Sequence, residues 1–229
     1  MFMKKILALI LVPSLLLGSL LLLSGCSKRV RYDNGDAYLT ATNGVIETDE
    51  EIHSVEIYWD GKLVSVIGSL LTEKVKFAED QTNDADKSLH YLVEEGVLKI
   101  YPCASGERLG DLSKTLILQL PTTMANNLRS LEIQAVGDTK VQLSTMKPSK
   151  LSVRAEDGSV NFEGEFKEAY VETVKGNFTA EIPTFTEIEF VSEIGNANIS
   201  SHLYGFMAVM LNENGSFTGD YEATQNGNI

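Results

Sequence analysis

The second half of the chain repeats a glycine-centred pattern with a period near 20 residues. In each unit an apolar run precedes the glycine and alternating apolar residues follow it. The glycines are Gly137, Gly158, Gly176, Gly195 and Gly215, and they are 21, 18, 19 and 20 residues apart. One such unit cannot bury its own apolar face, whereas stacked units form a continuous core. The repeat therefore predicts an all-β solenoid, a β-helix-like stack with coils of about 20 residues, clearest over residues 128–220.

Short runs of alternating apolar and polar residues predict strands from about residue 51 onward. Examples are 54–59 and 115–120. The segment 91–100 predicts a hairpin that turns at Glu95-Gly96. A helix is expected at most near Met124 to Leu128. The alternative fold is an antiparallel β-sandwich in which each unit is one hairpin.

Glycine is expected at the corner of each coil, because the chain there needs either positive φ or close approach between coils. In the last four units an apolar residue stands two positions after the glycine, as Val160 and Phe178 do. In the first unit Val141 and Leu143 arrive two residues late. This departure predicts a bulge or a wider corner in that unit.

The first 25 residues have the organisation of a secretory signal. Two lysines at positions 4 and 5 precede the uncharged, largely apolar stretch 6–23. A permanent transmembrane anchor is the alternative, because this stretch approaches the ~20 residues that cross a bilayer. Both readings place the rest of the chain on the outer side of the membrane.

The end of this segment, Leu23-Ser24-Gly25-Cys26, resembles a lipobox, the motif of bacterial lipoprotein signals. The resemblance implies diacylglycerol transfer to the Cys26 thiol and cleavage between Gly25 and Cys26. The mature chain would then be lipid-anchored outside the cytoplasm. Because residue 27 is serine and not aspartate, the anchor would be in the outer membrane of a host with two membranes.

Cleavage would leave 204 residues with a formal net charge of −15, since the signal contains two lysines and no acidic residue. Residues 26–50 are polar and predict a tether with the first turns, whereas 51–229 form the β-strand-repeat domain. Such an acidic chain repels nucleic acid, so no nucleic-acid partner is expected. With Cys26 lipidated, Cys103 has no partner for an intrachain disulfide, and we interpret it as a packed residue.

Stacking the coils on their glycines brings Glu156, Val174, Glu193 and Glu213 into one column. Carboxylates about 5 Å apart in neighbouring coils would bind a cation or raise each other's pKa. The alternative is a solvated edge that keeps other strands from docking.

The sequence otherwise predicts no catalytic residue, no metal site and no cofactor, because no known catalytic or metal-binding spacing occurs. The aromatic residues Tyr58, Trp59 and Tyr101 would suit sugar stacking, but lone strand aromatics are typical of a core.

The order of these features resembles the bacterial DUF4097 group of β-strand-repeat proteins, which are described as adhesin-like. The resemblance spans about residues 50–220 and rests on four features. They are the strand 52–59 with Gly61 after it, the segment 95–100, the run 114–121 and serial turns of the type Asp157-Gly158-Ser159-Val160. It implies an extracytoplasmic β-strand repeat and supplies no catalytic residue.

Together these observations predict a non-enzymatic binding or structural module of the cell envelope. Its expected partners are the membrane, through the lipid on Cys26, and a cell-wall polymer or an envelope protein. Two alternatives stay open: a carbohydrate-active enzyme built on the same coil, and a partner or sensor domain of an envelope-stress signalling system.

Overall fold

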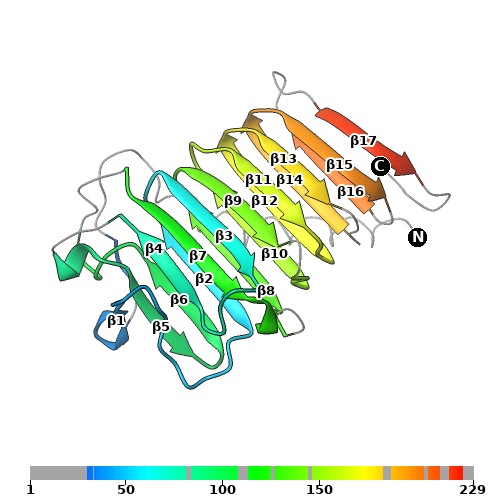
Figure 1. The fold of residues 1–229 in the computed structure, drawn as a ribbon. Coiled ribbons are helices and arrows are strands. Elements are labelled where there is room, and N and C mark those ends of the chain that lie inside the picture. Colours follow the sequence, from blue (N-terminus) through cyan, green and yellow to red (C-terminus); the bar gives the residue numbers. More distant parts are fainter. Residues whose placement is uncertain are drawn as a thin grey trace, which may run out of the picture.

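Two long β-sheets stack face to face in the computed structural model (Figure 1). The structure describes residues 30–32, 34–80, 84–107, 113–124, 127–143, 146–182, 187–203, 206–211 and 217–223. Among these residues the helices are limited to three short 3-10 turns, η1 (Gly35–Ala37), η2 (Ala85–Lys87) and η3 (Thr122–Met124). The structure thus confirms the predicted all-β, solenoid-like architecture, and the mostly parallel strand pairing rules out the antiparallel sandwich.

Sheet A has nine strands and sheet B has eight. In spatial order, sheet A contains β1 (Leu39–Thr40), β5 (His90–Glu94), β6 (Val97–Tyr101), β2 (Ser54–Trp59), β8 (Ser130–Ala135), β10 (Lys150–Ala155), β12 (Glu168–Lys175), β14 (Glu187–Ile194) and β16 (Phe206–Leu211). Sheet B contains β17 (Phe217–Ala223), β15 (Ala197–Leu203), β13 (Phe178–Ile182), β11 (Val160–Gly164), β9 (Asp138–Leu143), β3 (Leu63–Ser69), β7 (Thr115–Pro121) and β4 (Lys76–Glu79).

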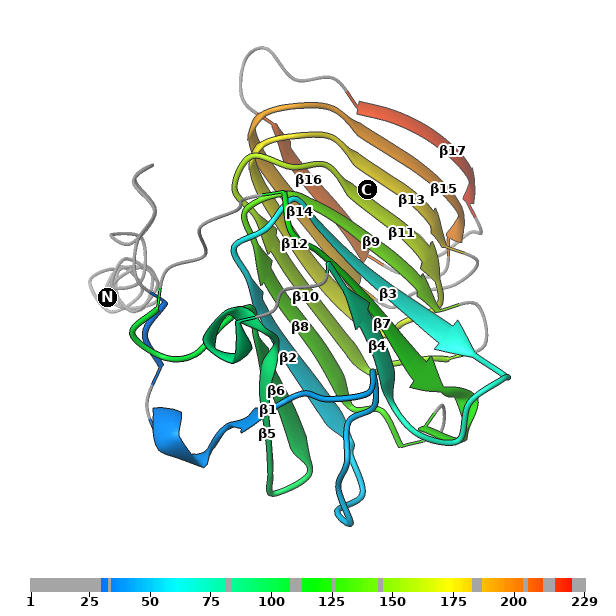
Figure 2. The same cartoon turned by 60° about the vertical axis from the view of Figure 1, so that its left-hand side comes forward.

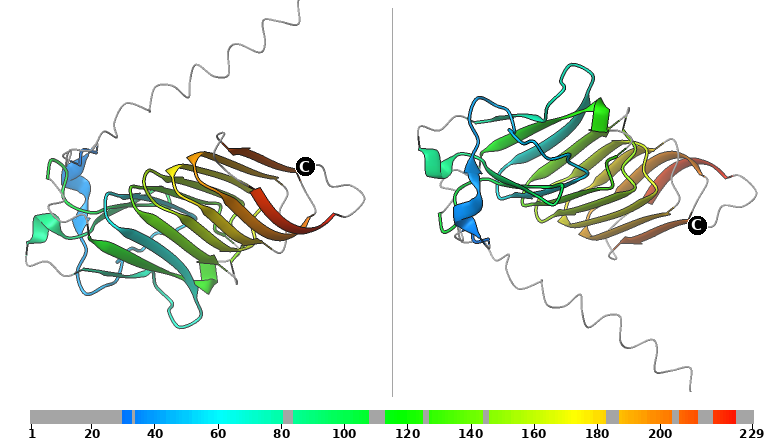
Figure 3. Two further views of the ribbon diagram at one scale, coloured as in Figure 1. Left: turned by 90° about the horizontal axis from the view of Figure 1, so that it is seen from above. Right: turned by 90° about the horizontal axis from the view of Figure 1, so that it is seen from below.

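From β8 onward the chain alternates between the two sheets, so each coil adds one strand to sheet A and the next strand to sheet B (Figure 2). The pairing is parallel and in register, with Val153 opposite Ile133 on one side and Val171 on the other. Parallel neighbours lie about 4.8 Å apart. The period of about 20 residues in the sequence therefore becomes a stack of coils along one axis (Figure 3).

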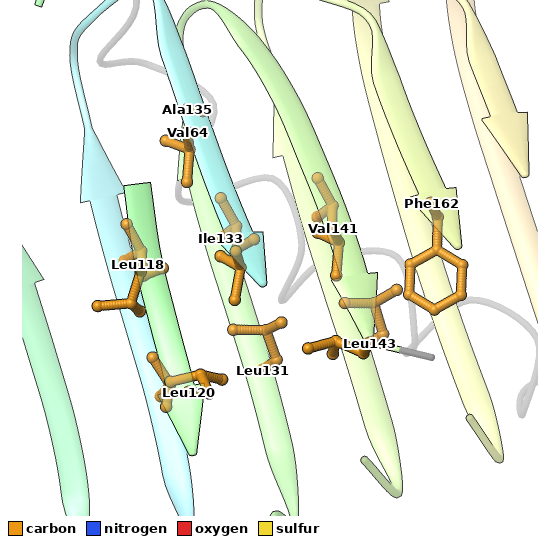
Figure 4. Close-up of a cluster of buried hydrophobic side chains, with 14 of the residues drawn as sticks. Val64, Leu118, Leu120, Leu131, Ile133, Ala135, Val141, Leu143 and Phe162 are labelled. Atoms are coloured by element: carbon orange, nitrogen blue, oxygen red, sulfur yellow. The ribbon is translucent and has the colours of Figure 1, made fainter. Parts of the chain in front are cut away.

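The core fills the space between the sheets. Side chains alternate between the two faces of a strand, so every second residue of each strand points inward. Leu131 and Ile133 of β8 face Val141 and Leu143 of β9, and all four side chains are fully buried (Figure 4). The apolar alternation that predicted strands is therefore the inward half of each strand.

The corner glycines are required by close approach and not by positive φ. A Cβ atom on Gly158 would collide with the backbone of Gly137, and one on Gly176 would collide with the backbone of Gly158. The same holds for Gly195 against Gly176. None of these glycines has positive φ. Of the two reasons expected for glycine at the corners, the structure therefore shows close approach between coils.

The bulge or wider corner predicted in the first unit is wrong. Thr139 of β9 pairs with Val160 and is fully buried, so a threonine occupies the inward position that the sequence pattern assigned to an apolar residue. The corner is in fact one residue shorter, because Gly137 comes two residues after Ala135, whereas Gly158 comes three residues after the paired Ala155.

At the N-terminal end the spatial order differs from the chain order. The coil β2–β3 lies between the coil β6–β7 on one side and β8–β9 on the other. The chain thus makes one coil, adds a coil to its N-terminal side, and then crosses back to continue the stack. The predicted hairpin is confirmed as β5 and β6, which turn at Glu95 and Gly96, both with positive φ. Near the segment where a helix was considered, the structure has only η3.

The described part of residues 26–50 lies against this end of the domain. The amide of Val30 donates to the carbonyl of Glu107 at 2.8 Å, β1 pairs with β5, and Ile46 is buried. The chain that leads to Cys26 therefore enters the solenoid at its N-terminal coil.

Candidate binding face

The outer face of sheet B carries a patch of polar side chains in two columns. The period of two directs one set of residues outward on each strand, and the parallel register stacks equivalent positions. We call these eight residues of β9, β11, β13 and β15 the B face. The first column is Lys140, Asn161, Thr179 and Asn198, and the second is Gln142, Glu163, Glu181 and Ser200.

The B face has a shallow, open depression. Its eight residues line a hollow of about 290 Å³, whose floor is formed by the strands that carry them. Gln142 Nε2 donates to Glu163 Oε2 at 3.1 Å, and this hydrogen bond fixes two neighbouring side chains of the second column. In contrast, within the described part of the chain, Asn161, Thr179 and Asn198 make no side-chain hydrogen bond or ion pair to another residue. Their amide and hydroxyl groups are exposed to solvent and are available to a ligand.

Side-chain hydrogen bonds at the corners hold the neighbouring coils in register beside the B face. The Asp138 carboxylate accepts from the amide of Ser159 at 2.9 Å. The Asn177 side-chain oxygen accepts from the amide of Asn196 at 3.0 Å and from its side-chain nitrogen at 3.2 Å. Because these bonds link successive coils, the columns are positioned by a rigid frame.

On the outer face of sheet A, one cluster of side chains is engaged in contacts of its own. Arg154 Nε lies 3.2 Å from a Glu172 carboxylate oxygen, and the Tyr170 hydroxyl donates to the same oxygen at 3.1 Å. The Arg154 guanidinium also lies 5.9 Å from the centre of the Tyr170 ring. Burial, followed by the charge of Glu172, raises the pKa of Tyr170 to about 12, so the hydroxyl stays a donor. These contacts engage Arg154, Tyr170 and Glu172, whereas Asn161, Thr179 and Asn198 of the B face make none within the described residues.

The aromatic residues considered for sugar stacking are occupied by the protein itself. The rings of Tyr58 and Tyr101 stack at 4.8 Å, and Tyr32 stacks on Tyr101 at 3.9 Å. Trp59 is buried, and its Nε1 donates to the carbonyl of Lys114 at 3.4 Å. Burial raises the pKa of Tyr32 and Tyr58 to about 12. These tyrosines fasten the N-terminal segment to sheet A.

The register places Glu156, Val174 and Glu193 in one column, because Thr173 pairs with Ala155 on one side and Ser192 on the other. Val174 lies between the two glutamates, so the carboxylates that would be direct neighbours are Glu193 and Glu213. Glu193 is exposed, and Glu213, the third member, lies outside the described residues. Gly25 and Cys26, the residues predicted for cleavage and lipidation, also lie outside them.

The structure instead pairs two other carboxylates. Glu163 and Glu181 are directly opposite each other in neighbouring coils, on the B face. Each stands five residues after the glycine of its unit, as do Gln142 and Ser200. That fixed offset was present in the sequence, but the column before the glycine was favoured because three of its four members are glutamate.

A buried ion pair in the N-terminal coil was not anticipated from the sequence. Lys114 Nζ lies 2.6 Å from Glu79 Oε2 and donates to the carbonyls of Lys87 and Pro102 at 2.7 Å each. The ammonium thus contacts one carboxylate and donates to two carbonyls of the protein, so the pair is structural. Burial raises the pKa of the neighbouring Cys103 thiol to about 11, which keeps it protonated at neutral pH.

A larger hollow of about 530 Å³ opens at the N-terminal end beside η1, but its polar groups are largely engaged. Ser105 Oγ donates to the carbonyl of Tyr32, and both ring nitrogens of His90 have partners. Among the described side chains, no three or more His, Cys, Asp or Glu residues are arranged to hold a metal ion. The described residues contain no helix that is long and apolar enough to cross a bilayer.

Comparison of the chain with protein-family models and with curated proteins finds no match. The resemblance to the DUF4097 group stays a prediction.

Proposed function

We propose that this chain is a lipid-anchored, non-enzymatic module of the cell envelope that binds an extended polymer along the B face. The observation that carries the proposal is the pair of in-register columns on β9, β11, β13 and β15, in which Asn161, Thr179 and Asn198 make no side-chain hydrogen bond to another described residue. These groups offer hydrogen bonds to a ligand, since no described residue engages them.

A polymer that lies along the solenoid axis meets equivalent groups once per coil, at intervals of about 4.8 Å. One hydrogen bond contributes only about 0.5–1.5 kcal/mol net. Four coils in register supply several such bonds to one chain, and each further bond forms at high effective concentration. Weak hydrogen bonds from successive coils thus add up to a higher affinity for a long ligand than any one coil provides.

Lipid on Cys26 would hold the module close to the membrane surface. Only three residues lie between Cys26 and Val30, which is bonded into the N-terminal coil, so the four residue-to-residue steps of the tether span at most about 14 Å. Lipid chains contribute about 0.8 kcal/mol per buried methylene, which makes a multiply acylated cysteine a stable anchor. A polymer of the envelope that lies near this surface is the ligand this geometry favours.

Sedimentation of the detergent-solubilised lipoprotein with purified cell-wall sacculi and with whole-envelope extracts tests the proposal. A triple substitution of Asn161, Thr179 and Asn198 by alanine is expected to weaken binding about tenfold or more. The matched control is Ser152→Ala on the outer face of sheet A, which should bind as the parent does. If the parent protein sediments with neither material, the proposed function is wrong.

One observation favours polysaccharide cleavage as a second candidate. Glu163 and Glu181 are neighbours in register and line the hollow of the B face, and a carboxylate pair is what glycoside hydrolysis uses. Release of reducing ends from a polysaccharide panel, lost in Glu181→Gln, would establish this activity. Inactivity of the parent across the panel would eliminate it.

A further inference from the structure

The proposed function leaves the polymer unnamed, and the chemistry of the B face narrows it. We propose that the B face binds a neutral polysaccharide, a chain rich in hydroxyl and acetamido groups, laid along the solenoid axis. This inference rests on the proposed function and adds the class of ligand.

Charge favours a neutral ligand over an anionic one. Lys140 is the single cation of the B face, while Glu163 and Glu181 lie side by side in the second column. The whole chain carries a formal charge of −13. At physiological ionic strength charges act over roughly 8 Å, so an anionic polymer in the hollow would be repelled by both carboxylates.

Hydrogen-bonding capacity points to sugar hydroxyls and acetamido groups. The amides of Asn161 and Asn198 and the hydroxyl of Thr179 both donate and accept, as sugar hydroxyls do. Glu163 and Glu181 accept only, and they match hydroxyl donors of the ligand. Every group of the two columns therefore finds a complementary partner on a polyhydroxylated chain.

An apolar protein partner does not fit the B face. Large hydrophobic side chains that are exposed in the described residues lie elsewhere, and they are Leu39, Leu70, Leu71, Ile117 and Ile194. The inward Phe162 and Ala180 are buried beneath the face. Protein interfaces concentrate their binding free energy in aromatic and other anchor residues, which the B face lacks.

The same lack of aromatic side chains makes the binding depend on length. Without a ring on which one sugar stacks, no single coil provides a dominant contact. Affinity should rise as the ligand reaches successive coils and level off once it spans the four strands from β9 to β15. A short sugar would bind weakly and a long one well.

Titration calorimetry or fluorescence with the full lipoprotein in detergent micelles tests this inference. The neutral probes are N-acetylglucosamine oligomers of increasing length, and the anionic probes are galacturonate oligomers matched in length. We expect the affinity for the neutral series to rise about tenfold from the dimer to the hexamer. The anionic hexamer should bind at least about tenfold more weakly than the neutral one at physiological salt.

A charge substitution and its matched control assign the site. Asn161→Asp replaces an amide donor by a carboxylate of the same size and should weaken the neutral hexamer by about fivefold or more. Ser152→Asp adds the same charge to the opposite sheet and should leave binding unchanged. Thermal unfolding of both variants verifies that each is folded.

Three results would overturn the inference: equal or tighter binding of the anionic oligomers, no dependence on length, or equal effects of the two substitutions. The proposed function would survive them if sacculi still bind and the triple alanine variant still loses that binding. If sacculi do not bind either, both fail.

Discussion

The coils of β8 to β15 and the N-terminal coil of β6 and β7 solve the same packing problem in different ways. In the first region each corner is a glycine, because a Cβ there would collide with the backbone of the preceding coil. In the second, the pairing of Leu63 with Thr115 and Asp138 places Lys114 level with Gly137. The glycines face toward the N-terminal end, and Lys114 belongs to the first coil at that end. The same register places Lys62 of the intervening coil at this level. The glycine of that coil is Gly61, one residue earlier, and a Cβ on it would collide with the backbone of Lys114.

The interiors of the two regions also differ in the side chains that fill them. The regular coils are filled mainly by apolar residues, and their buried polar side chains are the hydroxyls of Thr139, Thr173 and Ser192 among the described residues, whereas the N-terminal coil holds the charged pair of Lys114 and Glu79. Glu79 Oε1 also accepts from the amide of Leu89 at 2.8 Å, which ties the segment before β5 to β4. A solenoid needs its terminal coil closed against water. Here the closure uses a hairpin, two antiparallel edge strands and a buried, ion-paired lysine in place of another apolar coil.

The largest expected effect is that of breaking the buried pair. Lys114→Met leaves the Glu79 carboxylate buried without its cation and two carbonyls without their donor. Removal of one member of a buried ion pair destabilises by about 3–5 kcal/mol. The free energy of unfolding in urea, measured on the mature domain, should fall by that amount.

A second substitution separates charge from packing. Adding Glu79→Gln to Lys114→Met removes the uncompensated charge while its amide oxygen still accepts from Leu89. We expect recovery of about 1–2 kcal/mol. A further loss of stability would contradict the account of Lys114 as a counter-ion.

A smaller effect is expected at a regular corner. Gly158→Ala places a methyl group against the Gly137 backbone, which forces two coils apart and should cost about 2–3 kcal/mol. Asp157→Ala, at the exposed neighbouring position, should change stability by less than about 0.5 kcal/mol. If the two variants unfold alike, close approach between coils is not what requires glycine.

The sequence predicted much of the regular region and little of the N-terminal one. The glycine period and the apolar alternation follow directly from coil stacking, which is why the strands, their inward residues and the hairpin at Glu95 were predictable. The buried Thr139 was not, because a threonine in an apolar column resembles a shift of register. Counting back from glycine keeps Glu156, Val174 and Glu193 in one column, as counting forward does for Glu163 and Glu181. The exception is the corner at Gly137, which is one residue shorter.

The crossing of the chain at the N-terminal end could not be predicted for a different reason. A parallel coil pairs equally well on either side of β2 and β3, so the repeat does not specify the side to which the next coil is added. The burial of Lys114 depends on that choice. Lys114 stands level with the corner because β7 lies on the N-terminal side of β3 in sheet B. Charged residues in a sequence also predict exposure by default.

The smallest expected effect, on the reactivity of Cys103, tests whether the two regions open independently. With Cys26 replaced by serine, Cys103 is the only thiol of the chain, and it is fully buried in the N-terminal coil. Its pKa is raised to about 11, chiefly by burial. Relative to a pKa of 9.0 for an unperturbed cysteine, that rise lowers the thiolate fraction at pH 8 about a hundredfold. Alkylation by iodoacetamide should therefore be slow and should accelerate as the pH rises toward 11.

Alkylation then reports on opening of the N-terminal coil in each variant. Lys114→Met should accelerate the alkylation by opening the coil. The lysine charge lowers the pKa of the Cys103 thiol, so its loss alone would slow the reaction. Gly158→Ala should leave the rate near that of the parent, because its strain lies between β9 and β11 in the regular coils. Equal acceleration in both variants would show that the solenoid opens as one cooperative unit, and the contrast between its two regions would then be one of chemistry and not of stability.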